Sequence, residues 1–235
     1  MGSDARKGRL PRPVQTLGIN ASSRWVYVTT NYDRIGEKAI ELADMLPDWG
    51  EPSRTGSAGE RPIQVDRLLE GIPRYVPVLH LHGRVGWYRR LDLGGATPAV
   101  YSTAATRHQP GFGVPIVMLP GPDKAYDSDP VINSLWTQFL QSLRRARRVF
   151  VLGHALNDPA LVQALRDSVQ SLAAIAVSVF AKEGKPDVPE QSAIPVAEKV
   201  QAELGSAAVI PMRFGELGSG RAAIEDWLQR ERHKS

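Results

Sequence analysis

The chain has 235 residues, of which 42% are hydrophobic and 23% are charged, and its 29 Lys and Arg residues against 25 Asp and Glu residues leave a formal net charge of +4. This composition excludes wholesale disorder and leaves room for one large or two modest domains, while the charge is too small to indicate a specific nucleic-acid partner. The absence of Cys excludes disulfides, thiolate nucleophiles and cysteine-ligated zinc or iron–sulfur sites.

The chain opens with a polar lead, residues 1–24, which carries Arg and Pro but no apolar signal core. No later stretch approaches the roughly 18 apolar residues that a membrane span needs. We therefore expect a cytoplasmic protein that does not bind a membrane, with its folded domain over residues 25–230.

Six short segments rich in β-branched and aliphatic residues alternate with helical patterns. They are residues 25–29, 76–81, 115–119, 149–152, 175–180 and 207–210. Such segments are typical of parallel strands that are covered on both faces. Their alternation with helices predicts an α/β fold, Rossmann-like and doubly wound, with a mostly parallel sheet and helices on both faces.

Helices are predicted after Asp33, Asp129 and Asp158, each of which is placed to cap a helix N-terminus. Apolar residues recur at helical spacing over residues 35–46, 132–143 and 161–172, and again over residues 224–228. The remaining segments 47–62, 83–113 and 182–195 read as loops or insertions. Within the second, residues 86–91 and 98–101 flank a DLGG turn and predict a hairpin that forms a small lobe.

Polar residues follow four of the predicted strands, where an open α/β sheet binds its ligands. They are TTNYD at residues 29–33, His82 and Gly83, PGPDK at residues 120–124, and GHALND at residues 153–158. Taken singly, each is explained as a helix cap, a tight turn or a structural histidine. Their joint placement at one edge indicates a polar, nucleotide-like ligand that backbone N–H groups at helix N-termini contact.

These segments resemble the SIR2-like family, a bacterial and zinc-free branch related to the sirtuins and often found in antiphage defence. The resemblance rests on TTNYD, on LHG at residues 81–83, on PIVMLPGPDK at residues 115–124 and on VLGHALNDPAL at residues 151–161, and it covers about residues 25–172. The missing cysteines agree with it, because sirtuin deacylases usually carry a four-cysteine zinc module.

The resemblance implies hydrolysis of NAD⁺ at the nicotinamide–ribose bond, with NAD as the substrate and no metal. It implies that Asn31 orients the ribose or the attacking water, that His82 acts as the general base, and that Asp33 holds the nicotinamide carboxamide. The other cofactor contacts that it implies are Thr30 and Gly83, together with Gly153, His154 and Asn157 on the adenosine side.

One departure from the family pattern concerns the glycine-rich turn, which in the family lies well upstream of the Asn motif. Only 30 residues precede Asn31, and the nearest fragment, GINAS at residues 18–22, lies too close to it. We therefore expect the first strand and its turn to be missing, through truncation or degeneration. This leaves open a noncatalytic SIR2-like module that binds a nucleotide or a partner protein.

Two further alternatives remain open. His80 and His82 lie two residues apart on a strand and so share a face, which would suit a metal-dependent hydrolase, although no convincing further ligands follow. Kinship with sirtuins also allows a protein deacylase. The sequence does not decide whether the protein forms a homo-oligomer, whether a sensor domain is attached, or what triggers its activity.

Overall fold

The computed structural model describes residues 25–41, 45–50, 61–70, 75–89, 100–102, 113–119, 124–152, 154–169, 172, 174–182, 185–205 and 207–212. The predicted lead at residues 1–24 and the predicted helix at residues 224–228 lie outside these residues, so the boundaries of the domain stay a prediction. Among the helices of the described part, none is long and apolar enough to cross a membrane.

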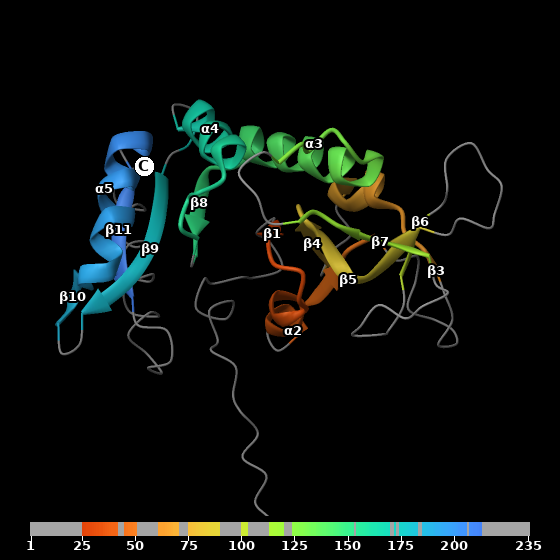
Figure 1. Ribbon diagram of the computed structural model, residues 1–235, viewed down its shortest axis with the longest axis horizontal. Helices are drawn as coiled ribbons and strands as arrows, with labels where there is room; N and C mark the ends of the chain where they lie inside the picture. Colours follow the sequence, from red (N-terminus) through yellow and green to blue (C-terminus); the bar gives the residue numbers. More distant parts are fainter. Residues whose placement is uncertain are drawn as a thin grey trace, which may run out of the picture.

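The first sheet is parallel and contains β1 (Tyr27–Thr29), β4 (Tyr75–His80) and β2 (Leu46–Asp48) in the order β1-β4-β2. Thr29 aligns with His80, so that the carboxyl ends of β1 and β4 lie next to each other. The helices α2 (Ile35–Glu41) and α3 (Pro130–Arg145) lie on opposite sides of this sheet (Figure 1).

The second sheet contains three parallel strands and one antiparallel strand. Its parallel strands are β8 (Arg148–Val151), β9 (Ala174–Lys182) and β11 (Ala208–Met212), and β10 (Lys185–Pro189) pairs antiparallel with β9. Helix α4 (Pro159–Ser168) connects β8 to β9, whereas the 3₁₀ turn η2 (Gln191–Ala193) and helix α5 (Ile194–Leu204) precede β11. Within the described residues, no strand pairing joins this sheet to the first one.

The third sheet is antiparallel and forms the predicted lobe. It consists of β3 (Arg61–Pro62), β6 (Val100–Ser102), β5 (Gly83–Arg89) and β7 (Val114–Val117), in the order β3-β6-β5-β7. The pairing of β5 with β6 confirms the expected hairpin partners. The parallel arrangement expected for residues 115–119 is wrong, because β7 runs antiparallel to β5 and only Ile116 of its four residues is buried.

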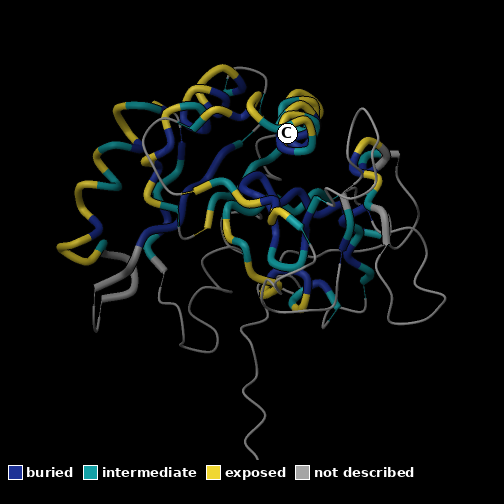
Figure 2. The backbone as a smooth tube through the Cα atoms, turned by 45° about the vertical axis from the view of Figure 1, so that its right-hand side comes forward, coloured by how far each residue is buried: buried dark blue, intermediate teal, exposed yellow. Residues whose placement is uncertain are grey.

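Apolar residues at helical spacing explain the core. Helix α3 buries Ile132, Leu135, Phe139 and Leu143 on one face, and α4 buries Leu161 and Leu165. Figure 2 shows the buried residues along the central strands and the exposed ones along the outer faces of the helices. Parallel sheets combined with these helices confirm the α/β class, and the burial pattern is that of a Rossmann-like fold.

Three predicted boundaries differ from the structure. Residue Leu46, expected in a helix, begins strand β2, because α2 ends at Glu41. The segments 47–62 and 182–195 are not continuous loops, since the first includes β3 and part of β2, and the second includes β10 and η2. The 3₁₀ turn η1 (Val65–Glu70) follows β3 and packs under α3.

Candidate active site

The loops that follow β1 and β4 lie side by side at the carboxyl ends of these strands. The Leu81 amide donates to the Thr29 carbonyl over 2.9 Å, and the Val85 amide donates to the Tyr32 carbonyl over 2.9 Å. The two predicted catalytic residues, Asn31 and His82, therefore occur in adjacent loops, as expected for neighbouring parallel strands.

His82 is held from both its backbone and its ring. Its carbonyl accepts a hydrogen bond from the Met118 amide over 2.8 Å, which ties it to the end of β7. The residue is only 5% exposed, and its Nε2 lies 3.0 Å from the hydroxyl of Tyr126. The ring of Tyr32 lies 6.4 Å away between centroids, and the Tyr32 hydroxyl donates to the Met118 carbonyl. His82 is thus a fixed group at the edge of the parallel sheet.

A buried carboxylate lies behind His82. Asp158 Oδ2 accepts hydrogen bonds from the Tyr126 hydroxyl over 2.5 Å and from Lys124 Nζ over 3.1 Å. The Lys124 Nζ is 3.3 Å from His82 Nε2, and the Asp158 Oδ2 is 3.6 Å from the same nitrogen. These four side chains, Lys124, Tyr126, His82 and Asp158, form what we call the His82 network. They come from the end of β4, from the segment before α3 and from the start of α4.

The sequence folds this way because Asp158 is also the N-cap of α4. Its Oδ1 accepts from the amides of Ala160 and Leu161 over 3.1 and 3.2 Å, and Pro159 occupies the first helical position. The cap orients the carboxyl group, so that Oδ2 faces Tyr126 and Lys124. The helix cap thus positions the carboxylate of Asp158 in a site whose other residues are distant in the sequence.

The charges of this network follow from its contacts. Burial alone would raise the pKa of Asp158, but the nearby His82 and hydrogen bonds from Tyr126, Lys124 and the Leu161 amide outweigh it and hold this pKa well below its usual range. Burial raises the pKa of Tyr126, and the hydrogen bond and charge of Asp158 raise it further. At neutral pH the network therefore contains a carboxylate and a protonated phenol.

The predicted adenosine-side residues lie in the loop before α4, except that Gly153 lies outside the described residues. His154 Nδ1 accepts a hydrogen bond from the Leu156 amide over 2.8 Å, so the proton of the neutral ring is on Nε2. Burial lowers the pKa of His154, and the positive charge of Lys124 adds to this, against the opposite effect of Asp158. Asn157 is exposed, with its Oδ1 3.5 Å from Lys199 Nζ.

This loop also carries the positive-φ residue Leu156. Its φ of 53° is unusual for a side chain with a Cβ, and the side chain is fully buried. Burial of Leu156 thus offsets the cost of a left-handed backbone and fixes the position of His154 and Asn157.

The residues predicted after β1 have local roles in the structure. Asn31 is exposed, and its amide donates to the Thr29 hydroxyl over 3.0 Å. Thr30 lies between these two and is partly exposed, and Asp33 Oδ1 accepts from the Ile35 amide over 2.9 Å at the start of α2. The carboxylate predicted to hold nicotinamide is therefore a helix cap here, and its contact with a ligand stays a prediction.

At the starts of α2, α3 and α4, backbone amides already bond to capping carboxylates. Those of Ala160 and Leu161 bind Asp158, those of Val131 and Ile132 bind Asp129 over 2.8 and 3.3 Å, and that of Ile35 binds Asp33. A ligand contact by these capped amides stays a prediction, whereas the start of α5, at Ala193, has no side-chain cap.

Gly83 has a steric reason to be glycine. Its φ is +84°, and a Cβ at this position would lie 2.0 Å from the Ile116 carbonyl oxygen. The close approach of β5 to β7 requires a residue without a side chain here. This geometry does not test the predicted contact of Gly83 with the cofactor, which stays a prediction.

His80 and His82 have different partners, contrary to the pairing that a shared strand face suggested. His80 Nε2 donates to Glu37 Oε1 over 2.9 Å, whereas His82 Nε2 contacts Tyr126. Among the described residues, no group of three or more His, Asp or Glu side chains could hold a metal ion.

Sequence reasoning did not assign a site role to Lys124, Tyr126 or Asp158. Lys124 and Asp158 occur in the quoted motifs, but Asp158 was explained as a helix cap. Tyr126 had no signal of its own, because its partners are 44 and 32 residues away.

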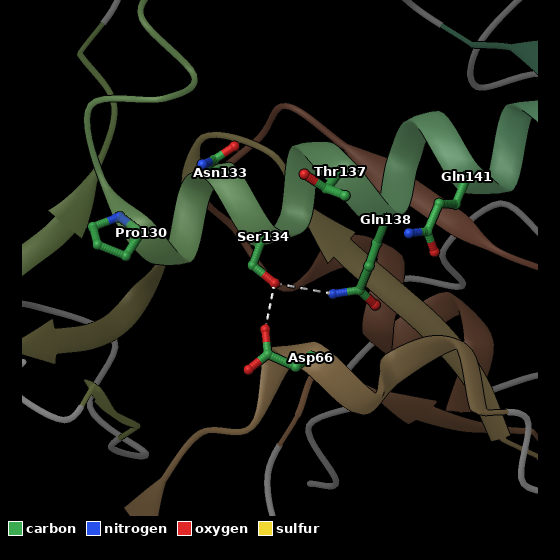
Figure 3. Close-up of a pocket in the computed structure, with 7 residues that line it drawn as sticks. All are labelled: Asp66, Pro130, Asn133, Ser134, Thr137, Gln138 and Gln141. Carbon is green, nitrogen blue, oxygen red and sulfur yellow. Dashed lines mark hydrogen bonds between the residues drawn. The ribbon is translucent and has the colours of Figure 1, made fainter.

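A separate surface pocket of about 380 Å³ lies between α3 and η1 (Figure 3). Its polar groups hold these two elements together, since Ser134 Oγ donates to Asp66 Oδ1 over 2.6 Å and the Gln138 amide donates to the Val65 carbonyl. None of the residues that line it belongs to the His82 network. We therefore regard the pocket as a structural junction.

Comparison with known proteins agrees with the resemblance seen in the sequence. The family model of the SIR2-like domain matches residues 26–201, which is most of the chain and includes all four residues of the His82 network. A comparison with curated proteins gives no match.

Proposed function

This chain belongs to the SIR2-like family, and we propose that it hydrolyses NAD⁺ at the bond between nicotinamide and ribose. SIR2-like domains bind NAD, so the family supplies the substrate class. The observation that carries the proposal is the position of His82. Its imidazole is buried and contacts the Tyr126 hydroxyl, and His82 lies in the loop next to the one that contains Asn31. We further propose a cytoplasmic setting and, from the resemblance, a role in antiphage defence.

The proposed reaction places modest demands on a protein. Cleavage of the carbon–nitrogen bond passes through an oxocarbenium-like state and needs a positioned ribose, an aligned water and a nearby proton acceptor. His82 would accept the proton, and the side chain of Asn31 would orient the ribose or the water. The SIR2-like site needs no metal for these steps, and a sensor domain or partner protein would supply any trigger.

A noncatalytic module that binds NAD or ADP-ribose is the second candidate. It is favoured by the departure from the family's glycine-rich turn, and the amides at the starts of α4 and α3 are already bonded to Asp158 and Asp129. Without a firm hold on the phosphates, ribose positioning would be weaker than in a dedicated hydrolase.

Release of nicotinamide from NAD⁺ by the full chain tests the proposal. We expect His82→Ala and Asn31→Ala each to lower the rate by about 10²-fold or more, the usual contribution of a proton acceptor or a positioning group. Asn133→Ala is the matched control, because Asn133 is an exposed residue of α3 that lines the separate pocket.

Calorimetry with NAD⁺ and ADP-ribose separates the two candidates. Binding without release of nicotinamide selects the noncatalytic module. Release that is equal in wild type and in both site variants would show that another protein or another site is responsible.

A further inference from the structure

We propose that Tyr126 and Asp158 are positioning residues that fix the tautomer of His82, placing its proton on Nε2 and leaving Nδ1 as the proton acceptor. The role of Nδ1 in cleavage rests on the proposed function, whereas the tautomer itself does not. The basis is the chain of contacts from Asp158 Oδ2 to the Tyr126 hydroxyl and on to His82 Nε2, over 2.5 and 3.0 Å.

The protons available to these three side chains determine which atom donates in each of the two contacts. An ionised carboxylate only accepts, so the single hydroxyl proton of Tyr126 points to Asp158. The contact between the Tyr126 oxygen and His82 Nε2 then requires its proton from the imidazole. In a neutral ring this places the proton on Nε2, and Nδ1 carries the free lone pair.

Lys124 is the neighbouring group whose contact competes with this assignment, because a donor 3.3 Å from Nε2 would suit an unprotonated Nε2. Lys124 can only donate, and its Nζ lies closer to Asp158 Oδ2, at 3.1 Å, than to His82 Nε2, at 3.3 Å. In the tautomer that we propose, Lys124 donates to the carboxylate, which is the shorter of its two contacts and joins opposite charges. Of the described residues, none forms a hydrogen bond to Nδ1, and Tyr32 contributes only its ring nearby.

The cap of α4 makes Asp158→Asn a sharp test. Because Oδ1 accepts from the Ala160 and Leu161 amides, the oxygen of the new amide must keep that position, which places its NH₂ group where Oδ2 was. The NH₂ then donates to the Tyr126 oxygen, and the hydroxyl proton turns to His82 Nε2. We expect the tautomer to switch, with the proton on Nδ1.

This switch should abolish the proton acceptor without removing a substrate contact. In the serine protease triad, the equivalent change of Asp to Asn lowers kcat by about 10⁴-fold through the wrong tautomer. For Asp158→Asn we expect kcat for nicotinamide release to fall by about 10²-fold or more, with a much smaller change in KM.

Asp129→Asn is the matched control. Asp129 caps α3 in the same way, followed by Pro130, and its Oδ2 accepts from Arg89 over 2.7 Å, but it contacts no histidine. The two variants make the same change of charge at the same kind of cap. We expect Asp129→Asn to leave the His82 tautomer and kcat unchanged.

The experiment is nitrogen NMR of the full chain labelled with ¹⁵N-histidine, which distinguishes the two tautomers directly, with His82→Gln identifying the signals of His82. The expected result is Nε2–H in wild type and in Asp129→Asn, and Nδ1–H in Asp158→Asn. Wild type with its proton on Nδ1, or Asp158→Asn with its proton still on Nε2, overturns the inference.

Tyr126→Phe serves as a second variant that leaves the helix cap intact. His82 Nε2 would then face Asp158 Oδ2 directly, now at 3.6 Å, so we expect the Nε2–H tautomer to persist with a smaller loss of kcat. A switch to Nδ1–H in this variant contradicts the inference. If the tautomers behave as expected but wild type releases no nicotinamide, the proposed function fails while the assignment of His82 stands.

Discussion

Glu37 and Arg84 form a buried ion pair that joins helix α2 to strand β5. Arg84 Nη2 donates to Glu37 Oε2 over 2.8 Å, its Nε also donates to the carboxylate, and the two residues are 2% and 1% exposed. His80 donates to the same carboxylate, and the Arg84 guanidinium lies 4.7 Å from the centre of the Trp49 ring. The pair is linked to the candidate site through His80, whose Nδ1 lies 3.4 Å from the Asn31 carbonyl oxygen.

Removing the charge of Glu37 should destabilise the protein strongly. Glu37→Gln leaves the buried Arg84 without its counter-ion, and such a loss costs about 3–5 kcal/mol. The free energy of unfolding, measured in urea, checks this. The matched control is Glu41→Gln on the same helix, whose partner Lys38 is exposed, and which should cost less than about 1 kcal/mol. Equal costs for the two variants would contradict the buried-pair argument.

Glu37 should also make stability depend on pH in the acid range. Burial would raise its pKa, but the hydrogen bonds and charges of Arg84 and His80 lower this pKa from 4.5 to about 2. Because the folded state holds the lower pKa, the unfolded state binds more protons at acid pH. The stabilisation is therefore complete above about pH 4.5 and is lost as the pH falls towards 2.

This loss should amount to a few kcal/mol, since one pKa unit corresponds to about 1.4 kcal/mol. Urea unfolding between pH 6 and pH 3, roughly the range over which the unfolded carboxyl gains its proton, measures the larger part of this loss. Asp158 adds a dependence of the same sign, because its pKa is also lowered. Glu37→Gln should flatten the profile in part, and an unchanged slope would show that Glu37 is not the group responsible.

Local signals predicted much of the fold. The Asp-Pro pairs at residues 129–130 and 158–159, each followed by apolar residues at helical spacing, correctly predicted where α3 and α4 begin. These signals succeed because a cap and an amphipathic face are encoded within a few turns of one helix.

Pairing partners were harder to predict than the elements themselves. Residues 115–119 look like any short apolar strand, and nothing local distinguishes a parallel central strand from the antiparallel edge strand β7. Strand β2 contains Pro47 and follows a helical pattern, so only its pairing with β4 defines it. For the same reason the sequence indicated His82 but not Tyr126, whose contacts arise only when distant segments meet.

A chelator should leave nicotinamide release unchanged if the proposed function holds. The two candidate ligands of a metal hydrolase, His80 and His82, direct their Nε2 atoms at Glu37 and at Tyr126, and the proposed role of His82 needs no metal. Activity measured before and after extended treatment with EDTA tests this. A loss of activity that added Zn²⁺ or Mn²⁺ restores would favour the metal-dependent alternative.

Substituting Gly83 should reveal a backbone constraint at the site. In Gly83→Ala, the new Cβ would lie 2.0 Å from the Ile116 carbonyl oxygen, at a φ of +84°, so β5 and β7 would have to separate. Because strained backbone and a broken strand contact add, we expect a loss of more than about 3 kcal/mol in the free energy of unfolding.

Gly205→Ala is the matched control for this steric argument. Gly205 also has a positive φ, of +49°, but a Cβ there meets nothing within 4 Å, so its cost should be only about 1 kcal/mol. Urea unfolding of both variants separates backbone strain from collision with β7. If Gly83→Ala were as stable as Gly205→Ala yet bound NAD⁺ more weakly, the glycine would be needed for the ligand and the steric explanation would be wrong.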